Sequence, residues 1–237
     1  MNVKSQIKHY GIFLIGLFIA SLGVAFSTKA GLGTSPVASV PYSVSIVNHA
    51  LTFGWWLNIW SLIQILVQVA LLRRKCKPAE IIIQTILAFV YGYMTDFSCR
   101  LLSRIQPLNY AEKLLWMLVG CVVLAFGIWI QYKGGVAMLP GEAMNRAISL
   151  TTGKSYENVK IFFDVLYILL AGAVSLIFTG KLQGVREGSV IAAVLIGNII
   201  KLYNRAFDKI TKNRRRIDSN NLTDISKEWR YDKKTVA

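Results

Sequence analysis

Charged residues are scarce in this sequence. Only 16% of its 237 residues are charged, whereas 54% are hydrophobic, and soluble domains usually carry about a quarter of charged residues. The uncharged residues form six long runs, which makes a soluble globular domain a poor interpretation. With its flanks, each run reaches the roughly 20 residues that a helix needs to cross a bilayer, and open strands cannot satisfy their backbone there. The runs are Ile12–Phe26, Trp55–Leu72, Ile81–Thr95, Leu114–Tyr132, Val165–Thr179 and Ser189–Ile200.

Cysteine and histidine are also rare. The three cysteines, Cys76, Cys99 and Cys121, are far apart and form no CxxC pair, and the two histidines are isolated. This spacing predicts neither a metal site nor a disulfide. The sequence also lacks a nucleophile–base pair, a phosphate-binding loop and an HExxH motif. We therefore predict that the protein is not an enzyme, has no catalytic residues and needs no cofactor.

Acidic residues are few as well. The 27 lysines and arginines outnumber the 12 acidic residues, which gives a net charge of +15. In a soluble protein this excess would suggest nucleic acid as a partner. Here the positive charges lie at the ends of the apolar runs and in the C-terminal tail, where they meet anionic lipid headgroups. We therefore expect the bilayer as the partner and no nucleic acid.

Two stretches of the chain resemble each other. Residues 22–36 read LGVAFSTKAGLGTSP and residues 126–140 read FGIWIQYKGGVAMLP, and Gly23 and Gly127 lie 104 positions apart. Between the identical positions, most apolar residues fall opposite apolar ones. The identical pairs at this offset, which are hard to obtain by chance, are Gly16 and Gly120, Gly23 and Gly127, Lys29 and Lys133, Gly31 and Gly135, Pro36 and Pro140, and Ser45 and Ser149. The pattern predicts an internal duplication.

The resulting prediction is an all-α integral membrane protein with about six transmembrane helices and two short re-entrant or half-helices, in a 3+3 repeat. Residues 1–9 form the N-terminal segment and residues 205–237 a basic polar tail. Repeat 1 covers 10–106, with spans 10–28, 55–73 and 81–102 and a short helix 36–51. Repeat 2 covers 107–204, with spans 114–133, 160–179 and 188–204 and a short helix 140–150.

The two short segments allow two topologies. If they re-enter without crossing, the N-terminus, the loop from Arg73 to Lys77 and the basic tail share one side. If they cross, the chain has eight spans and that loop faces the opposite side. The positive-inside rule favours re-entry and places both termini in the cytoplasm. Three spans per repeat then make the second repeat inverted relative to the first.

Glu142 is the only acidic residue in either short segment. Ionisable groups inside a membrane are costly and usually functional, so Glu142 could bind a cation or carry a coupling proton. An acidic residue near a helix start is also favoured by the helix dipole alone. Asp96 and Asp164 could pair with basic residues, and we expect Asp164 to be a helix-terminus residue.

Further candidates for substrate binding surround these segments. Lys29 and Lys133 end their spans, where they either extend to the headgroups or attract an anionic substrate. Asn145, Ser35 and Ser39 add polar groups in or beside the short segments. The six predicted binding residues are therefore Glu142, Asn145, Lys29, Lys133, Ser35 and Ser39, with no metal ligands among them.

Two boxes carry a resemblance to a known group. Residues 31–36, GLGTSP, and residues 184–189, GVREGS, together resemble the bacterial YczE/YyaS/YitT-like integral membrane proteins, from about Tyr10 to Tyr203. The resemblance implies a multi-pass protein of the bacterial cytoplasmic membrane and supplies no binding residues. Relatives tend to have Trp-Asp after the first Ser-Pro, whereas this chain has Val37-Ala38. One acidic position is therefore absent, and Glu142 occupies the equivalent place in the second repeat.

Inverted repeats with short helices near the membrane midplane are a recurring transporter design. The sequence therefore predicts a small-solute transporter or permease whose site lies between the two short helices. The alternative is a non-transporting accessory or regulatory membrane protein that acts through partner proteins. A homo-oligomer is compatible with either function.

Overall fold

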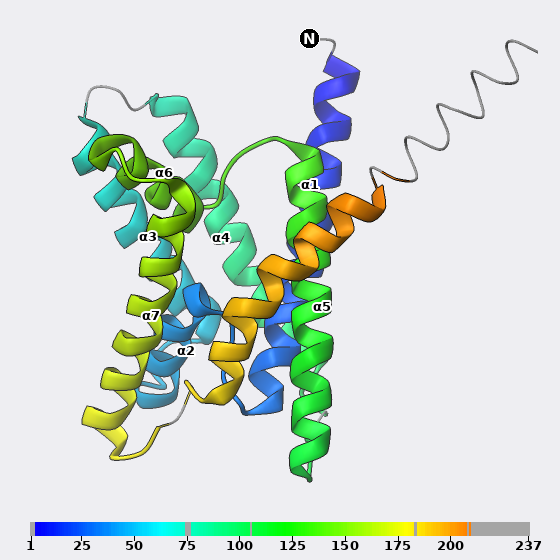
Figure 1. Cartoon of the computed structure of the whole chain (residues 1–237), viewed down its shortest axis with the longest axis vertical. Coiled ribbons are helices and arrows are strands. Elements are labelled where there is room, and N and C mark those ends of the chain that lie inside the picture. Colours follow the sequence, from blue (N-terminus) through cyan, green and yellow to red (C-terminus); the bar gives the residue numbers. More distant parts are fainter. Residues whose placement is uncertain (1–2, 74–76, 105, 183, 208, 210–237) are drawn as a thin grey trace, which may run out of the picture. The chain divides into compact units, whose positions relative to one another are not determined.

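The computed structural model describes residues 3–73, 77–104, 106–182, 184–207 and 209. The chain divides into two compact units, Met1–Ile199 and Ile200–Ala237, and the contacts below all lie within the first. In the described residues the structure is helical, without strands, as predicted. The helices are α1 (Val3–Ala30), α2 (Pro36–Val47), α3 (Phe53–Leu72), α4 (Pro78–Leu101), α5 (Tyr110–Gly134), α6 (Pro140–Thr152), α7 (Tyr156–Thr179) and a last helix, Glu187–Phe207 (Figure 1).

Six of these helices are long and apolar enough to cross a membrane: α1, α3, α4, α5, α7 and the last helix. This finding confirms the predicted multi-pass, all-α class. The short helix expected over 36–51 is shorter in the structure, because the backbone of Asn48 is extended and its side chain accepts a hydrogen bond from the N–H of Ala50. Of the predicted tail 205–237, residues 208 and 210–237 lie outside the described residues, as do residues 1 and 2 of the N-terminal segment.

The starts and ends of the helices agree with the local sequence. Pro36 and Pro140 occupy the first turns of α2 and α6, where a missing N–H leaves no hydrogen bond unmade. Thr52 caps α3 by accepting from the N–H of Trp55. Gly31 directly follows α1 and Gly135 directly follows α5, and both have positive φ, 69° and 61°. The chain therefore leaves both helices through the left-handed region.

Helices α1 and α5 pack closely at glycines, and the contacts come in equivalent pairs. A Cβ atom added to Gly16 would lie 2.8 Å from the carbonyl oxygen of Gly127, and one added to Gly120 would lie 2.9 Å from the carbonyl oxygen of Gly23. Adding or subtracting 104 turns the first pair into the second. The two helices therefore run antiparallel, with their backbones in contact at glycine positions.

A second pair of contacts between α1 and α5 is also related by the offset of 104 residues. A Cβ atom at Gly16 would lie 2.8 Å from the backbone nitrogen of Gln131, and one at Gly120 would lie 2.8 Å from the backbone nitrogen of Ser27. Gly134, at the end of α5, lies beside Phe13 in the third turn of α1. The contacts of α1 and α5 are thus related by a local twofold axis that passes between Gly16, Gly23, Gly120 and Gly127.

Contacts with α4 fix the direction of α3. Helix α4 runs parallel to α1, since Phe13 shares a buried cluster with Leu87, and further along both helices the hydroxyls of Ser21 and Ser98 are 2.9 Å apart. Helix α3 is antiparallel to α4, because its first turn, at Gly54, lies against Asp96 near the end of α4. Helix α3 therefore starts at the end of the bundle where α1 finishes. The segment containing α2 returns to the end from which it left, as the re-entrant topology requires.

Candidate functional site

The two short helices meet at their first turns. A Cβ atom added to Gly141 of α6 would lie 3.3 Å from Cγ1 of Val37 in α2, and 3.4 Å from the side-chain amide of Gln64 in α3. The residues before the helices, Ser35 and Leu139, make no side-chain capping hydrogen bond. Two helix N-termini, with their free N–H groups and partial positive charge, are thereby brought together inside the bundle.

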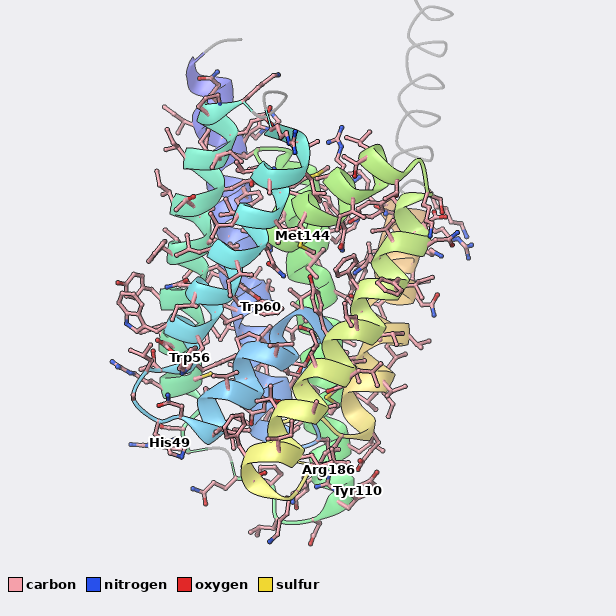
Figure 2. All side chains as sticks on the ribbon, turned by 90° about the vertical axis from the view of Figure 1, so that its left-hand side faces the viewer. His49, Trp56, Trp60, Tyr110, Met144 and Arg186 are labelled. Atoms are coloured by element: carbon pink, nitrogen blue, oxygen red, sulfur yellow. The ribbon has the colours of Figure 1, made fainter. Side chains whose placement is uncertain are left out.

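Tyr167 of α7 connects the elements around this meeting point. Its hydroxyl accepts a hydrogen bond of 3.3 Å from the side-chain nitrogen of Gln64, and its carbonyl lies 3.3 Å from the hydroxyl of Ser39, which donates to it. Its ring packs against Trp60 of α3 with a centroid distance of 5.6 Å. Met144 of α6 belongs to the same buried cluster (Figure 2 labels Trp60 and Met144). The predicted residue Ser39 thus lies at the site, where its hydroxyl is hydrogen-bonded to the backbone carbonyl of Tyr167.

Several buried polar atoms in this region have no hydrogen-bond partner in the described structure. The indole Nε1 of Trp60 and the amide Oδ1 of Asn145 are among them. Asn145 is 2% exposed and follows Gly141 by four residues, so it lies on the same face of α6. Unpaired polar groups are expensive in an apolar interior. The predicted residue Asn145 therefore lies one turn beyond Gly141 on the same face of α6, with a buried amide oxygen that has no partner in the described structure.

Glu142 lies at the side of the meeting point that faces α5 and α7. The hydroxyl of Tyr132 donates a hydrogen bond of 2.6 Å to its Oε1 atom. Burial raises the pKa of the Glu142 carboxyl, and the hydrogen bond from Tyr132 and the charge of Lys160 act in the opposite direction. The carboxylate accepts this bond from a side chain of α5, so it does more than complement the dipole of α6.

The other two acidic candidates have structural roles. Asp96 accepts hydrogen bonds from the hydroxyl of Thr52 and, at 2.7 Å, from the N–H of Gly54, so it stabilises the start of α3. Asp164 pairs with Lys160 at 3.1 Å and lies in the third turn of α7, which begins at Tyr156. The expectation that Asp164 is a helix-terminus residue is therefore wrong. Its position is set by pairing one turn after Lys160.

The structure does not bring Lys29 and Lys133 together. Each lies in the last turn of its helix, α1 or α5, and these helices are antiparallel. Lys133 immediately precedes Gly134, which lies beside Phe13 of α1. Lys29 is 16 residues after Phe13 in the same helix, so the two lysines are about 24 Å apart along α1. The Nζ atom of Lys133 lies 5.6 Å from the ring centroid of Trp129. The two lysines cannot hold the same small substrate.

The two sequence boxes form one structural unit. Gly33 and Val185 make an antiparallel β-bridge, and the N–H of Gly188 donates to the carbonyl of Leu32 at 3.0 Å. The backbone N–H of Thr34 donates to the hydroxyl of Ser189 at 3.2 Å. These bonds hold the loop that precedes α2, including Ser35, against the start of the last helix. The boxes therefore fix the position of α2, whose first residue is Pro36.

Sequence reasoning missed the residues that connect the site. Gln64, Trp60 and Tyr167 lie inside apolar runs, and Tyr132 lies at the end of one. The usable signal was polarity: Gln64 is a polar residue within an uncharged span, where it needs a partner. Only packing reveals that its partner is Tyr167, 103 residues away. In the described parts of the chain, no three His, Cys, Asp or Glu side chains are grouped as metal ligands.

The fold and the site define a class: a multi-pass, all-helical protein with six candidate spans and two short helices that meet inside the bundle. The chain belongs to a family of unknown function, DUF6198, whose model matches residues 7–205. It is also 26% identical over 209 residues to the "Uncharacterized protein YyaS" of Bacillus subtilis (strain 168), which covers 87% of this chain and 98% of that protein. These matches confirm the resemblance to YyaS-like proteins. No solved structure matches the chain.

Proposed function

We propose that this protein is a small-solute transporter or permease of the bacterial cytoplasmic membrane, built as a 3+3 inverted repeat. The observation that carries the proposal is the contact between the first turns of α2 and α6 at Val37 and Gly141. Helix ends that lie inside a membrane protein without caps are found where they line a substrate or ion path. The buried, unpartnered atoms of Trp60 and Asn145 are consistent with a polar ligand at this place.

The matched contacts between α1 and α5 support the inverted repeat. The ends of α1 and α5, at Ala30 and Gly134, and the starts of α2 and α6, at Pro36 and Pro140, also differ by 104 positions. Each short helix packs against the second span of the other half, α2 on α7 and α6 on α3. A pseudo-twofold arrangement of this kind supplies two equivalent conformations, which alternating access requires.

Transport can be tested by narrowing the meeting point. In Gly141→Val, the added Cβ atom would lie 3.3 Å from Cγ1 of Val37 and 3.4 Å from the amide of Gln64, and the two further methyl groups would fill this narrow space. A Cβ atom at Gly197 in the last helix meets nothing within 4 Å. We expect proteoliposomes with the purified protein to take up small solutes, measured by swelling in a panel of polyols, amides and salts. Uptake should be lost in Gly141→Val and retained in Gly197→Val. Equal uptake by both variants would place the path elsewhere.

The accessory function is the second candidate, because the tail from residue 205 is basic and polar. Deletion of the residues after Asn213 separates the two functions, although this segment lies outside the described residues. A transporter core should keep its flux without the tail, whereas a protein that acts through partners should lose its cellular effect while still inserting into the membrane.

The proposed topology can be tested by accessibility of single cysteines. We expect His49→Cys and Arg73→Cys, at exposed positions before and after α3, to lie on opposite sides of the membrane. Both are introduced with Cys76, Cys99 and Cys121 changed to serine. On intact cells a membrane-impermeant thiol reagent should label position 49, and position 73 only after lysis. The reverse pattern would place both termini outside the cytoplasm.

A further inference from the structure

The helix ends at the meeting point carry more positive than negative potential when Glu142 is neutral. Each helix N-terminus is equivalent to about +0.5 charge, so two of them supply about +1. The first turn of α2 contains no acidic residue, and the position equivalent to Glu142 is occupied by Ala38, which is 3% exposed. The single negative charge of ionised Glu142 therefore compensates the partial positive charges of both helix ends. Protonation of Glu142 leaves these positive charges uncompensated.

The side chains at the same place are uncharged and include unused hydrogen-bond donors. The indole N–H of Trp60 is buried and has no acceptor in the described structure. Tyr167 accepts from Gln64, which leaves its own hydroxyl proton available to a ligand. Asn145 is buried without a partner for its Oδ1 atom, and a side-chain amide can also present its N–H groups to a ligand after rotation. Free N–H and O–H groups at helix N-termini are typical of anion sites.

The charged and titratable groups around Glu142 are defined. Tyr132 of α5 donates to Oε1, and Lys160 and Tyr156 of α7 lie close enough to interact with the carboxyl electrostatically. Lys160 is already paired with Asp164. On α6 itself, Arg146 directs its Nη1 atom to the sulfur of Met138. Oε2 of Glu142 is therefore the oxygen at which a proton can bind while Tyr132 keeps its bond to Oε1.

Resting on the proposed transport function, we infer that the meeting point of α2 and α6 binds a small monovalent anion that is carried together with one proton on Glu142. Protonation removes the negative charge beside the helix ends, and the anion replaces it. Anion and proton therefore bind cooperatively, and each increases the affinity for the other. The loaded site has the same net charge as the empty, ionised one, so transport is electroneutral.

Binding is tested first, without any transport step. The full-length protein in detergent is heated in sodium nitrate, chloride or formate, and in sodium gluconate, a much larger organic anion, as the reference at equal ionic strength. We expect at least one small anion to raise Tm, with an affinity that rises about tenfold per pH unit of acidification above the pKa of Glu142. In Glu142→Gln, the affinity should be high and independent of pH.

Trp60→Phe keeps an aromatic ring beside Tyr167 and removes the indole N–H. We expect a several-fold loss of anion affinity with unchanged Tm in gluconate. Trp55→Phe is the matched control, since Trp55 is 40% exposed and lies one turn earlier in α3. If all three small anions leave Tm unchanged at acidic pH up to 50 mM or so, a range typical of weak sites, the anion site is refuted. Equal losses in both tryptophan variants would refute the assignment to this place.

Flux is tested in proteoliposomes that contain a pH-sensitive dye. An inward gradient of the anion that bound should acidify the lumen, without dependence on membrane potential, and Glu142→Gln should transport the anion without acidification. Anion flux without acidification in the wild type would overturn the proton coupling. Binding with the predicted pH dependence but no flux would leave the anion site standing and refute the transport function.

Discussion

The loops that lead into α2 and α6 both follow a long helix and both precede a proline at the start of a short helix, but they are held by different interactions. The loop before α2 is fixed by backbone: Gly33 pairs with Val185, and Leu32 accepts from the N–H of Gly188. The loop before α6 rests on apolar side chains, with Val136 and Leu139 packed against a cluster on α1 and α4. Directional hydrogen bonds fix a position closely, whereas apolar contacts tolerate small shifts. The comparison suggests that α2 is the fixed short helix and α6 the adjustable one.

The largest effect is expected at Gly33, where the first loop has no room. Its φ is 107°, and an added Cβ atom would collide with the hydroxyl of Ser189. We expect Gly33→Val to destabilise the protein by more than about 3 kcal/mol. The control is Ala137→Val, at the equivalent position of the second loop, with an effect of about 1 kcal/mol or less. Thermal unfolding in detergent measures both, and equal losses would mean that the loops are equally constrained.

A smaller effect is expected when the bond to Thr34 is removed. Ser189→Ala leaves the buried N–H of Thr34 without an acceptor, which should cost about 1–3 kcal/mol. Thr85→Ala is the equivalent change on α4, where the hydroxyl bonds only to the carbonyl of Ile81 in its own helix. We expect little change in Tm for that control. A loss at Thr85 as large as at Ser189 would show that the effect of Ser189→Ala does not depend on the bond to Thr34.

The apolar loop should respond to loss of side-chain volume. Leu139→Ala removes contacts with the α1–α4 cluster, and we expect a loss of about 1–2 kcal/mol, because Leu139 is only partly buried. Leu150→Ala, at a position on α6 that is 68% exposed, is the control and should be nearly neutral. Amide hydrogen exchange should also be faster over 135–139 than over 31–35. Equal exchange rates would contradict a fixed α2 and an adjustable α6.

The smallest effect is the dependence of stability on pH through Glu142. Burial raises the pKa of this carboxyl in the folded protein above its ordinary value of 4.5. The folded state therefore holds the proton more tightly than the unfolded state. This contribution to stability is fully present below pH 4.5 and is lost as pH rises through the folded pKa. The wild type should thus lose Tm relative to Glu142→Gln between pH 4.5 and 8, whereas parallel curves would show that the carboxyl is not perturbed.

Much of the architecture was predictable from local sequence. Uncharged runs of sufficient length predicted six spans, and Pro36 and Pro140 marked the first turns of both short helices. The site was predictable in part. The structure places Glu142, Asn145 and Ser39, which were predicted as polar residues of the short segments, on α2 and α6. It separates Lys29 from Lys133, because their distance depends on the relative direction of α1 and α5.

The sequence by itself determined the membrane class, the number of spans and the offset of 104, because hydropathy and identity along the chain are local properties. Only the tertiary structure decided which residues meet. It placed Tyr167 beside Gln64 and Trp60, joined the GLGTSP and GVREGS boxes into one unit, and set Val37 against Gly141. The physical reason is that these contacts depend on helix direction and on close approach at glycines, and both are properties of packing between distant segments.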